Sequence, residues 1–312
     1  MARLHPGKQL SIYELPSMRL LGNNSIKIPG VRDFEWAPSK IPGERRPGAQ
    51  EQHMLCYWTP EQGNFPAKVA LMNVPSKEIV GTKNLFNVSD VRPTPVRKAN
   101  MQCKLHWQSQ SEFLCVKVDR HTKTKKTSFT NLEIFHVREK NIPVEVIEVK
   151  DNVIAFAWEP KGERFATVMT ADTINPERGL AGLRTNINFY MLEKSTRTAG
   201  INNFKLIRIQ PQLASLIIGS IDKKQLNSIF WSPKGRFVTF ANLGRGITQF
   251  DFEIYDCDYE GDNKDINKEL NANIMAICQE ESYGTTDIEW DPTGRYITTS
   301  SSSWKHAVYT SS

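Results

Sequence analysis

The residues best suited to chemistry in this chain are two histidine–cysteine pairs, His53 with Cys56 and Cys103 with His106. Two thiolates and two imidazoles are a common zinc ligand set, provided that all four converge tetrahedrally. Each pair falls on a segment expected to be a β-strand, where residues three apart point to opposite faces of the sheet. We therefore expect ordinary core residues here and predict no metal site.

Signatures of catalysis are also missing from the sequence. There is no Gly-x-Ser-x-Gly elbow and no phosphate-binding loop, since Gly244-Arg-Gly246 lacks its third glycine. Carboxylates are spread along the chain rather than paired at one spot. We predict no catalytic residues, no cofactor and no small-molecule substrate, and hence a chain that is not an enzyme.

Basic residues gather in three short segments, which are the candidate binding sites. The chain has 40 Lys and Arg against 34 Asp and Glu, a net charge of +6. Clustered cations can hold nucleic-acid phosphates through counterion release, although such charges can also serve only to keep a chain in solution. The candidate contacts are Arg45, Arg46, Arg92, Arg97, Lys98, Lys123, Lys125 and Lys126.

The segment around Lys123 contains no aromatic residue that could stack on a base. Any nucleic-acid contact that it makes is therefore expected to be directed at the backbone and blind to sequence.

The elements that position these segments are predicted by a repeated phrase. The phrase consists of an apolar residue, then any residue, then tryptophan. Three copies continue into turns that end at Gly162, Gly235 and Gly294. A type I turn favours Ser or Asp first, Pro second and Gly fourth, and a β-branched or aromatic run follows each of these turns. Each phrase thus predicts a hairpin. The five tryptophans, predicted to lie in the core, are Trp36, Trp107, Trp158, Trp231 and Trp290.

A second kind of strand alternates with the first and ends in an aromatic or bulky residue. Its copies are Leu10–Tyr13, Val69–Met72, Leu132–Phe135, Ile187–Tyr190 and Phe252–Tyr255. A further short run lies beyond these strands, as in Glu78–Val80, Val144–Ile147 and Phe204–Ile207. Four strands per repeat are typical of a β-propeller, whereas a β-sandwich, the alternative, lacks a fixed internal repeat.

The predicted fold is all-β, a propeller fragment of four-stranded blades that takes up residues 1–312 as a single domain. Four blades are complete, and a half-blade stands at each end. The two halves either join to close a five-bladed ring or mark the ends of an arc cut from a larger propeller. The pattern alone leaves both arrangements open.

Composition places the chain among cytoplasmic proteins. No apolar run approaches the ~18 residues of a membrane span, and Met1–Pro6 lacks the apolar stretch of a signal peptide. The five cysteines are odd in number and scattered on predicted strands, which indicates buried thiols in a reducing compartment.

Several longer strings resemble the b-subunit family of eukaryotic translation initiation factor three. They include Gln50–Asn64, Asn84–Asn87, Phe113–Arg120 and Asp287–Tyr296, and the resemblance runs from about Lys8 to Ser303. It implies a scaffold that links the other subunits of that factor and docks on the small ribosomal subunit, through ribosomal protein or the ribosomal RNA backbone. Members carry a propeller of more blades than this chain supplies, so the resemblance favours the arc.

The chain departs from the family pattern in three places. Residues 91–102 look like an insertion, residues 305–312 break off where the family continues to a helical tail, and the family's RNA-recognition motif is absent. Contacts of the tail with the g and i subunits are therefore not assigned to this chain.

Two other kinds of protein share part of the pattern. The propeller of a prolyl-oligopeptidase-like hydrolase uses the same Trp-Ser-Pro-x-Gly turn, but it accompanies a catalytic domain with a serine elbow. A general WD-repeat adaptor of another complex would carry Trp-Asp at strand ends, whereas Trp290-Asp291 precedes a turn.

Overall fold

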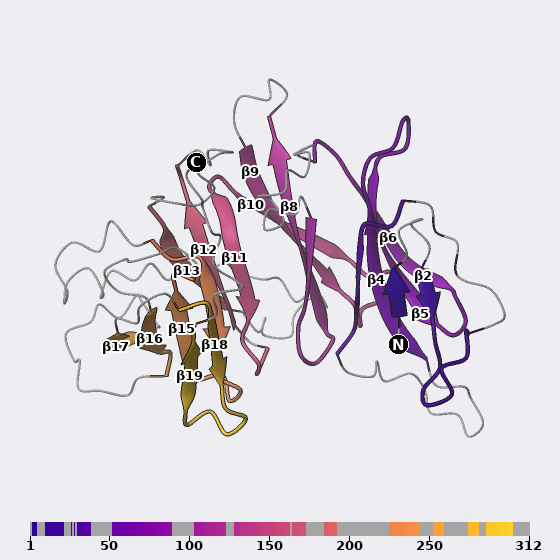
Figure 1. Ribbon diagram of the computed structural model, residues 1–312. Helices are drawn as coiled ribbons and strands as arrows, with labels where there is room; N and C mark the ends of the chain where they lie inside the picture. Colours follow the sequence, from indigo (N-terminus) through magenta and orange to yellow (C-terminus); the bar gives the residue numbers. More distant parts are fainter. Residues whose placement is uncertain are drawn as a thin grey trace, which may run out of the picture. The chain divides into compact units, whose positions relative to one another are not determined.

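The computed structural model describes residues 2–4, 10–21, 26, 28, 30–38, 52–88, 103–122, 128–162, 164–172, 184–191, 225–243, 252–258, 274–280 and 285–301. All the named elements in these ranges are β-strands (Figure 1). No helix within them is long and apolar enough to cross a membrane. The chain divides into two compact units, Met1–Arg92 with Asn100–Val149, and Pro93–Ala99 with Lys150–Ser312.

The first unit contains one two-stranded and two four-stranded antiparallel sheets. The orders are β1-β2, β3-β4-β5-β6 and β7-β8-β9-β10, so neighbouring strands follow one another along the chain. The strands are β1 (Ala2–Leu4), β2 (Leu10–Ile12), β3 (Asp33–Trp36), β4 (His53–Thr59), β5 (Ala67–Val74), β6 (Ile79–Leu85), β7 (Cys103–Trp107), β8 (Phe113–His121), β9 (Ser128–His136) and β10 (Val144–Val149).

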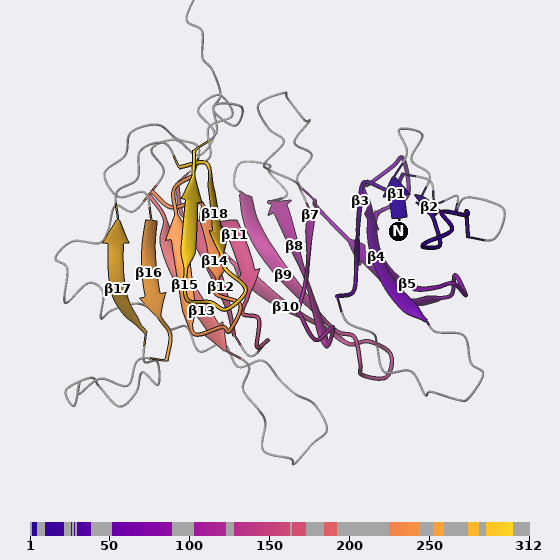
Figure 2. The same ribbon diagram turned by 60° about the horizontal axis from the view of Figure 1, so that its bottom comes forward.

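The second unit repeats this plan with a three-stranded, a four-stranded and a two-stranded sheet. Their orders are β11-β12-β13, β14-β15-β16-β17 and β18-β19, and Figure 2 shows the four-stranded sheet with its strands side by side. The strands are β11 (Asn152–Trp158), β12 (Arg164–Thr170), β13 (Asn186–Met191), β14 (Ser228–Trp231), β15 (Phe237–Ala241), β16 (Phe252–Asp256), β17 (Met275–Glu280), β18 (Asp287–Trp290) and β19 (Ile297–Ser300).

The predicted β-propeller blade, a four-stranded repeat, is confirmed. Each tryptophan phrase ends the first strand of a sheet, at the C-terminal ends of β3, β7, β11, β14 and β18. The alternating strands are β2, β5, β9, β13 and β16, and the further runs are β6 and β10. The predicted run Phe204–Ile207 lies outside the described residues, next to the sheet for which three strands are described.

The N-terminal end of the chain differs from the sequence prediction. The strand expected to come first is β2, and β1, which is three residues long, precedes it and pairs with it. On its other side β2 forms a bridge between Leu10 and Ile26, with backbone hydrogen bonds of 2.9 and 3.2 Å. Strand β2 therefore has a neighbour on both sides.

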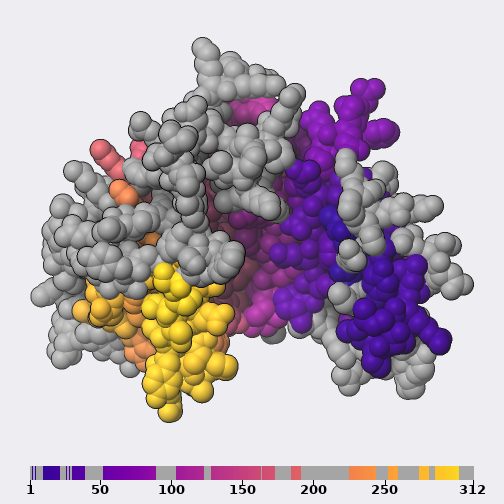
Figure 3. Space-filling view, viewed as in Figure 1, coloured from indigo at the N-terminus to yellow at the C-terminus, as the bar shows by residue number. Residues whose placement is uncertain are grey.

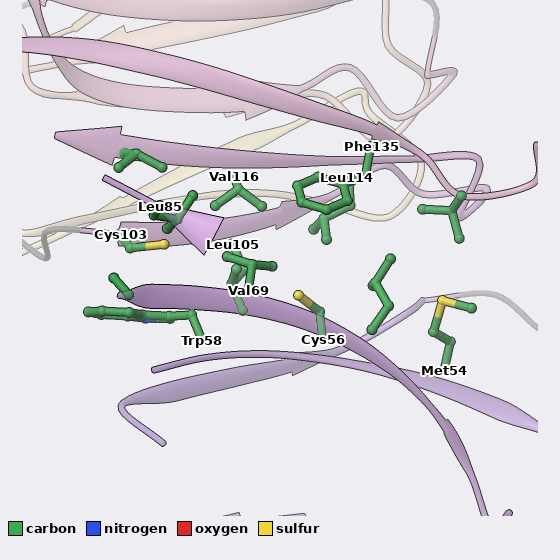
Figure 4. Packing of buried hydrophobic residues seen from close by; sticks show 14 residues of the cluster. Met54, Cys56, Trp58, Val69, Leu85, Cys103, Leu105, Leu114, Val116 and Phe135 are labelled. Carbon is green, nitrogen blue, oxygen red and sulfur yellow. The ribbon is translucent and has the colours of Figure 1, made fainter. Parts of the chain in front are cut away.

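Sheets in the first unit are buried on both faces, as expected of propeller blades. One face of the β3–β6 sheet packs against the β7–β10 sheet in a cluster that includes Cys56, Val69 and Val116 (Figure 4). The opposite face, with Leu55 and Tyr57, packs against β1 and β2. Consecutive residues of β4 enter different clusters because side chains alternate along a strand.

Packing in the second unit follows the same rule. Phe189, Trp231 and Phe240 belong to one cluster, which joins the β11–β13 and β14–β17 sheets. Phe252 and Ile288 belong to a second cluster on the other face of the β14–β17 sheet. Beyond it, the β18–β19 hairpin reaches the surface, where Figure 3 shows it in yellow and its last three residues are exposed.

Strand β11 departs from strict alternation at one residue. Strict alternation places Ile154 on one face with Phe156 and Trp158, but the pairing with β12 shifts between Val153 and Ala155. Ile154 instead packs with Ala155 and Ala157 against the same cluster. A bulge of this kind adds an unpaired residue and reverses the alternation beyond it.

The turns after the tryptophans have the predicted hydrogen bonds. The Gly235 N–H donates to the carbonyl oxygen of Ser232 (2.8 Å), and the Gly294 N–H donates to that of Asp291 (2.9 Å). Both glycines have a positive φ, +81° and +70°, which residues with a Cβ rarely adopt. A β-carbon on Gly235 would lie 2.6 Å from Glu159 Oε1, whereas one on Gly294 would find no atom closer than 3.7 Å.

Polar contacts link neighbouring sheets of the second unit at these turns. The guanidinium of Arg164 donates to both carboxylate oxygens of Glu159 (2.7 and 2.9 Å) and reaches across to the carbonyl oxygen of Cys257 and to Asp258 (each 2.8 Å). The Trp231 indole Nε1 donates to the carbonyl oxygen of Ala157 at 3.2 Å. Neighbouring sheets are thus joined by specific hydrogen bonds as well as by apolar packing.

Candidate interaction surface at the strand ends

The predicted contact residues themselves have no described placement. Arg45, Arg46, Arg92, Arg97, Lys98, Lys123, Lys125 and Lys126 all lie outside the described residues. What the structure does describe is the strand end on either side of each basic segment. The positions of these ends show from which part of a sheet each segment departs.

Two of the three basic segments depart from neighbouring strand ends. Residues 89–102 follow Val88, just after β6, and residues 123–127 follow Thr122, just after β8. Val88 and Arg120 form an antiparallel bridge, and the His121 N–H donates to the carbonyl oxygen of Asn87 at 3.1 Å. We name Phe86–Val88 together with Arg120–Thr122 the β6–β8 junction, where the chain leaving β6 meets the end of β8 (Figure 1).

The third segment, which carries Arg45 and Arg46, departs elsewhere. Residues 39–51 connect β3 to β4 at the end of the sheet where Trp36 pairs with Leu55. The β6–β8 junction adjoins the opposite end, where Leu85 pairs with Ala67. The structure therefore brings the flanks of two basic segments together and separates the third, because antiparallel strands in chain order connect at alternate ends.

Arg120 is the central side chain of the junction. Its guanidinium donates to the carbonyl oxygen of Phe86 and, at 2.5 Å, to the carboxylate of Glu133. Glu133 is fully buried, and Lys83 Nζ lies 3.8 Å from its second oxygen. A buried carboxylate is stable only when it is paired, and here one carboxylate meets two cations. Arg120 and Lys83 are each positive and Glu133 is negative, so the net charge of these three groups is positive.

Phe86 is the functional candidate that sequence reasoning missed. Its side chain is 60% exposed at the β6–β8 junction, beside the backbone from which the Lys123 segment departs. No aromatic residue lies within that segment, but Phe86 lies close to the strand end from which the segment departs. The signal available in the sequence was the string Asn84–Asn87, which carries part of the family resemblance.

Of the histidine–cysteine pairs, the two cysteines lie in the core as expected, whereas His106 is half-buried and His53, the first residue of β4, is exposed, so the prediction of core residues is wrong for His53. Cys56 and Cys103 are buried in the same apolar cluster, and desolvation raises the pKa of both thiols well above the usual value. His53 instead makes an edge contact with the ring of Trp36, at 6.5 Å between centroids. Desolvation lowers the pKa of His106 to about 3. In the part of the chain that the structure describes, no three His, Cys, Asp or Glu side chains are grouped to hold a metal ion.

The five tryptophans predicted for the core differ in burial. Trp158 and Trp231 are 9% exposed, and Trp36, Trp107 and Trp290 are half-buried. Two of them donate indole hydrogen bonds to the preceding sheet, Trp231 to Ala157 and Trp290 to Phe230. The Nε1 atom of Trp107 is buried and has no hydrogen-bond partner among the described residues.

Four-stranded sheets that repeat in chain order and pack face to face define a β-propeller repeat protein, with two basic segments departing from one junction. Residues 98–174 and 212–312, more than half of the chain, match the family model described as eukaryotic translation initiation factor eIF2A. The chain belongs to this family.

Curated relatives match almost the whole chain. It is 49% identical over 308 residues to the B subunit of eukaryotic translation initiation factor 3 from Aspergillus clavatus, an alignment that covers 98% of this chain and 38% of that protein. The protein of the same name from Emericella nidulans is 49% identical over 309 residues, with the same coverage. The resemblance seen in the sequence is confirmed, and the chain spans 38% of the length of these relatives.

Among solved structures, an acylaminoacyl peptidase from Pyrococcus horikoshii aligns with a TM-score of 0.38 and 7% identity. The alignment covers 73% of this chain and 30% of that one. A likeness at this level carries no conclusion about function.

Proposed function

We propose that this chain is a non-enzymatic scaffold portion of the eukaryotic translation initiation factor 3 complex. In this role it associates with other subunits of the complex and with the small ribosomal subunit, in the cytoplasm. The observation that carries the proposal is the 49% identity, along 98% of the chain, to a protein named as the B subunit of that factor.

The fold suits a scaffold because its strands are held from both sides. Sheets buried on both faces are stiff, and binding residues commonly lie on the segments between strands, which in this sequence differ in length and charge. The net positive charge at the β6–β8 junction supports an RNA-backbone contact by the two segments that depart from it. Residues 91–102, the apparent insertion, form part of one of them.

Membership of the complex is tested by isolating the whole protein from cells. We expect the other subunits of initiation factor 3 to co-purify with it and small ribosomal subunits to co-sediment with it. Loss of both associations would contradict the proposal. Covalent labelling of the protein by a serine-directed fluorophosphonate would favour the hydrolase alternative instead.

The RNA contact is tested by charge reversal within one segment. Changing Lys123, Lys125 and Lys126 to Glu is expected to weaken RNA binding and to flatten its dependence on salt, by about 0.7 in logarithmic slope for each phosphate that is no longer held. The matched control changes Lys123, Lys125 and Lys126 to Arg, which keeps every charge in the same segment and should leave the slope unchanged. An unchanged slope in the lysine variant would mean that these charges are only solvated.

We further propose that residues 1–312 form an arc of a larger propeller rather than a five-bladed ring. Closure of the ring requires a strand from the C-terminal half-blade beside β2, and both sides of β2 already have neighbours at Leu10. When cysteines are introduced by Ser11→Cys in β2 and Thr299→Cys in β19, we expect no disulfide to form between these two positions under mild oxidation. A disulfide between them would establish the closed ring.

A further inference from the structure

We propose that the exposed face of the β18–β19 hairpin is a docking surface for a further β-sheet of the same repeat. A tryptophan of that sheet stacks on Tyr296 and donates its indole hydrogen bond to the carbonyl oxygen of Glu289. The inference rests on the arc proposed above and deepens it, because it states what binds at one end of the arc and through which atoms. It is carried by the way in which the β14–β17 sheet receives the β18–β19 hairpin.

The contacts between the β14–β17 sheet and the hairpin centre on Trp290 and its turn. The Trp290 indole donates to the carbonyl oxygen of Phe230 at 3.2 Å. Its ring is stacked on that of Phe237, with 6.4 Å between the centroids and 13° between the planes. The turn that follows rests on the preceding turn, since a β-carbon on Gly294 would lie 3.7 Å from Pro233. The β14–β17 sheet therefore receives the hairpin through a carbonyl, a ring and a turn.

The β18–β19 hairpin carries a matching carbonyl, ring and turn at the same distances along the chain from its own tryptophan. Strand register agrees, because the residue before the tryptophan pairs with a threonine in both sheets, Thr239 in β15 and Thr298 in β19. A carbonyl oxygen can accept two hydrogen bonds, so one that pairs within its sheet can also accept an indole N–H. The corresponding residues are Phe230 and Glu289, Phe237 and Tyr296, and Pro233 and Pro292.

Exposure distinguishes the two sets of residues. Thr239 is fully buried and Phe237 is half-buried, whereas Thr298 is exposed and the side chain of Tyr296 is 72% exposed. Ile297 packs against the β14–β17 sheet, so its neighbours Tyr296 and Thr298 point to the opposite face of the hairpin. The face that the next sheet covers in the β14–β17 sheet is accessible in the β18–β19 hairpin.

The chemistry of the link specifies the occupant. An indole combines an aromatic face, which can stack on Tyr296, with an N–H that can bond to the Glu289 carbonyl oxygen. The first tryptophan of a second copy of this chain, Trp36, already packs against β1 and β2. The docking sheet therefore comes from outside residues 1–312. The Aspergillus clavatus relative, of whose length this chain spans 38%, is long enough to hold further sheets.

Docking is tested by the accessibility of a thiol at position 296. Tyr296→Cys is made together with Cys278→Ser, because the other four cysteines are buried. Maleimide labelling of position 296 is followed by mass spectrometry in residues 1–312 and in the whole protein isolated from cells with its co-purifying subunits. We expect labelling to be more than about ten-fold slower in the whole protein, since a covered thiol reacts only when the surface opens.

The control for this comparison is Phe65→Cys in the first unit. Phe65 is 78% exposed in the turn between β4 and β5, and it has no place in the tryptophan link. A thiol there should react at the same rate in both proteins. Equal rates at position 296 would overturn the docking proposal.

A photochemical cross-link identifies the occupant. Substitution of Tyr296 by the photoreactive amino acid p-benzoylphenylalanine, followed by illumination of the whole protein, should link position 296 to a peptide that contains an apolar-x-Trp phrase. A link to RNA or to a peptide without tryptophan would overturn the proposal. The cysteine pair at positions 11 and 299 separates this failure from failure of the arc. A disulfide there overturns both, whereas its absence together with rapid labelling at position 296 overturns the docking alone.

Discussion

The indole Nε1 of Trp290 donates a hydrogen bond of 3.2 Å to the carbonyl oxygen of Phe230, which immediately precedes Trp231. Trp231 makes the equivalent bond, also 3.2 Å, to Ala157, which immediately precedes Trp158. The tryptophan of one sheet is therefore tied to the strand that carries the tryptophan of the sheet before it. The phrases at Trp158, Trp231 and Trp290 thus supply the donors and the acceptors of both links.

Removing one of these links should cost measurable stability. Trp231→Phe loses the hydrogen bond to Ala157 and leaves a small cavity, with an expected loss of about 2–4 kcal/mol in the free energy of unfolding. The control is Trp107→Phe, whose indole Nε1 has no hydrogen-bond partner among the described residues. Its loss should be smaller by about 1 kcal/mol in urea unfolding. Equal losses would show that the link contributes nothing.

The turn glycines provide a second test. Gly294→Ala is expected to cost about 1–2 kcal/mol because alanine is strained at a φ of +70°. Gly235→Ala carries the same strain and in addition presses on Glu159, which is 1% exposed and bonded to Arg164. We expect it to lose at least about 2 kcal/mol more. Thermal unfolding of the two variants compares them directly, and similar melting temperatures would contradict the close packing at Gly235.

Stability in mild acid should depend on His106. Desolvation, with the positive charges of Lys104 and Lys117, lowers its pKa from 6.5 to about 3. The unfolded chain therefore takes up a proton below pH 6.5 while the folded chain does not, so stability is complete above that pH. It falls by up to about 1.4 kcal/mol per pH unit as the pH drops toward 3.

The measurement is the free energy of unfolding between pH 7 and pH 4.5. His106→Gln should show a shallower decline than the unaltered protein, whereas His121→Gln, a half-buried histidine at the end of β8, serves as the control. The same decline in all three proteins would place the proton uptake at other groups.

The buried charge at the junction gives a fourth prediction. Arg120→Met leaves Glu133 buried with Lys83, at 3.8 Å, as its one remaining ion-pair partner among the described residues, so a loss of about 3 kcal/mol or more is expected. Arg138→Met removes an exposed pair with Glu112 and should cost no more than about 1 kcal/mol. Adding Glu133→Gln to Arg120→Met should recover part of the loss in chemical unfolding. No recovery would mean that Arg120 acts through packing alone.

Local patterns account for most of what the sequence predicted. The turn after Trp231 is specified by its own Ser, Pro and Gly, and the strands on either side by their β-branched and aromatic residues. Strand β1 was missed because three residues are too few to show a period. Ile154 departs from the alternation of its strand because a bulge depends on pairing with β12 rather than on the sequence of β11.

The β6–β8 junction could not be predicted from such local patterns. Val88 follows β6 and Arg120 lies in β8, which are strands of different sheets, so their bridge depends on how those two sheets pack. The sequence did indicate the basic segments. It did not indicate that two of them depart from the same junction, or that Phe86 lies at that junction. Contacts between residues far apart in the chain are set by tertiary packing, to which single-sequence reasoning has no access.

The tryptophan link has a direction. The β14–β17 sheet offers a carbonyl acceptor to the sheet after it and an indole donor to the sheet before it, so the three sheets of the second unit join head to tail, as protomers do in a heterologous assembly. Such a link carries no information about the total number of sheets. One blade can therefore be gained or lost in evolution without altering the chemistry of any remaining link, and the number of blades must be set by the shape of the packing rather than by these bonds.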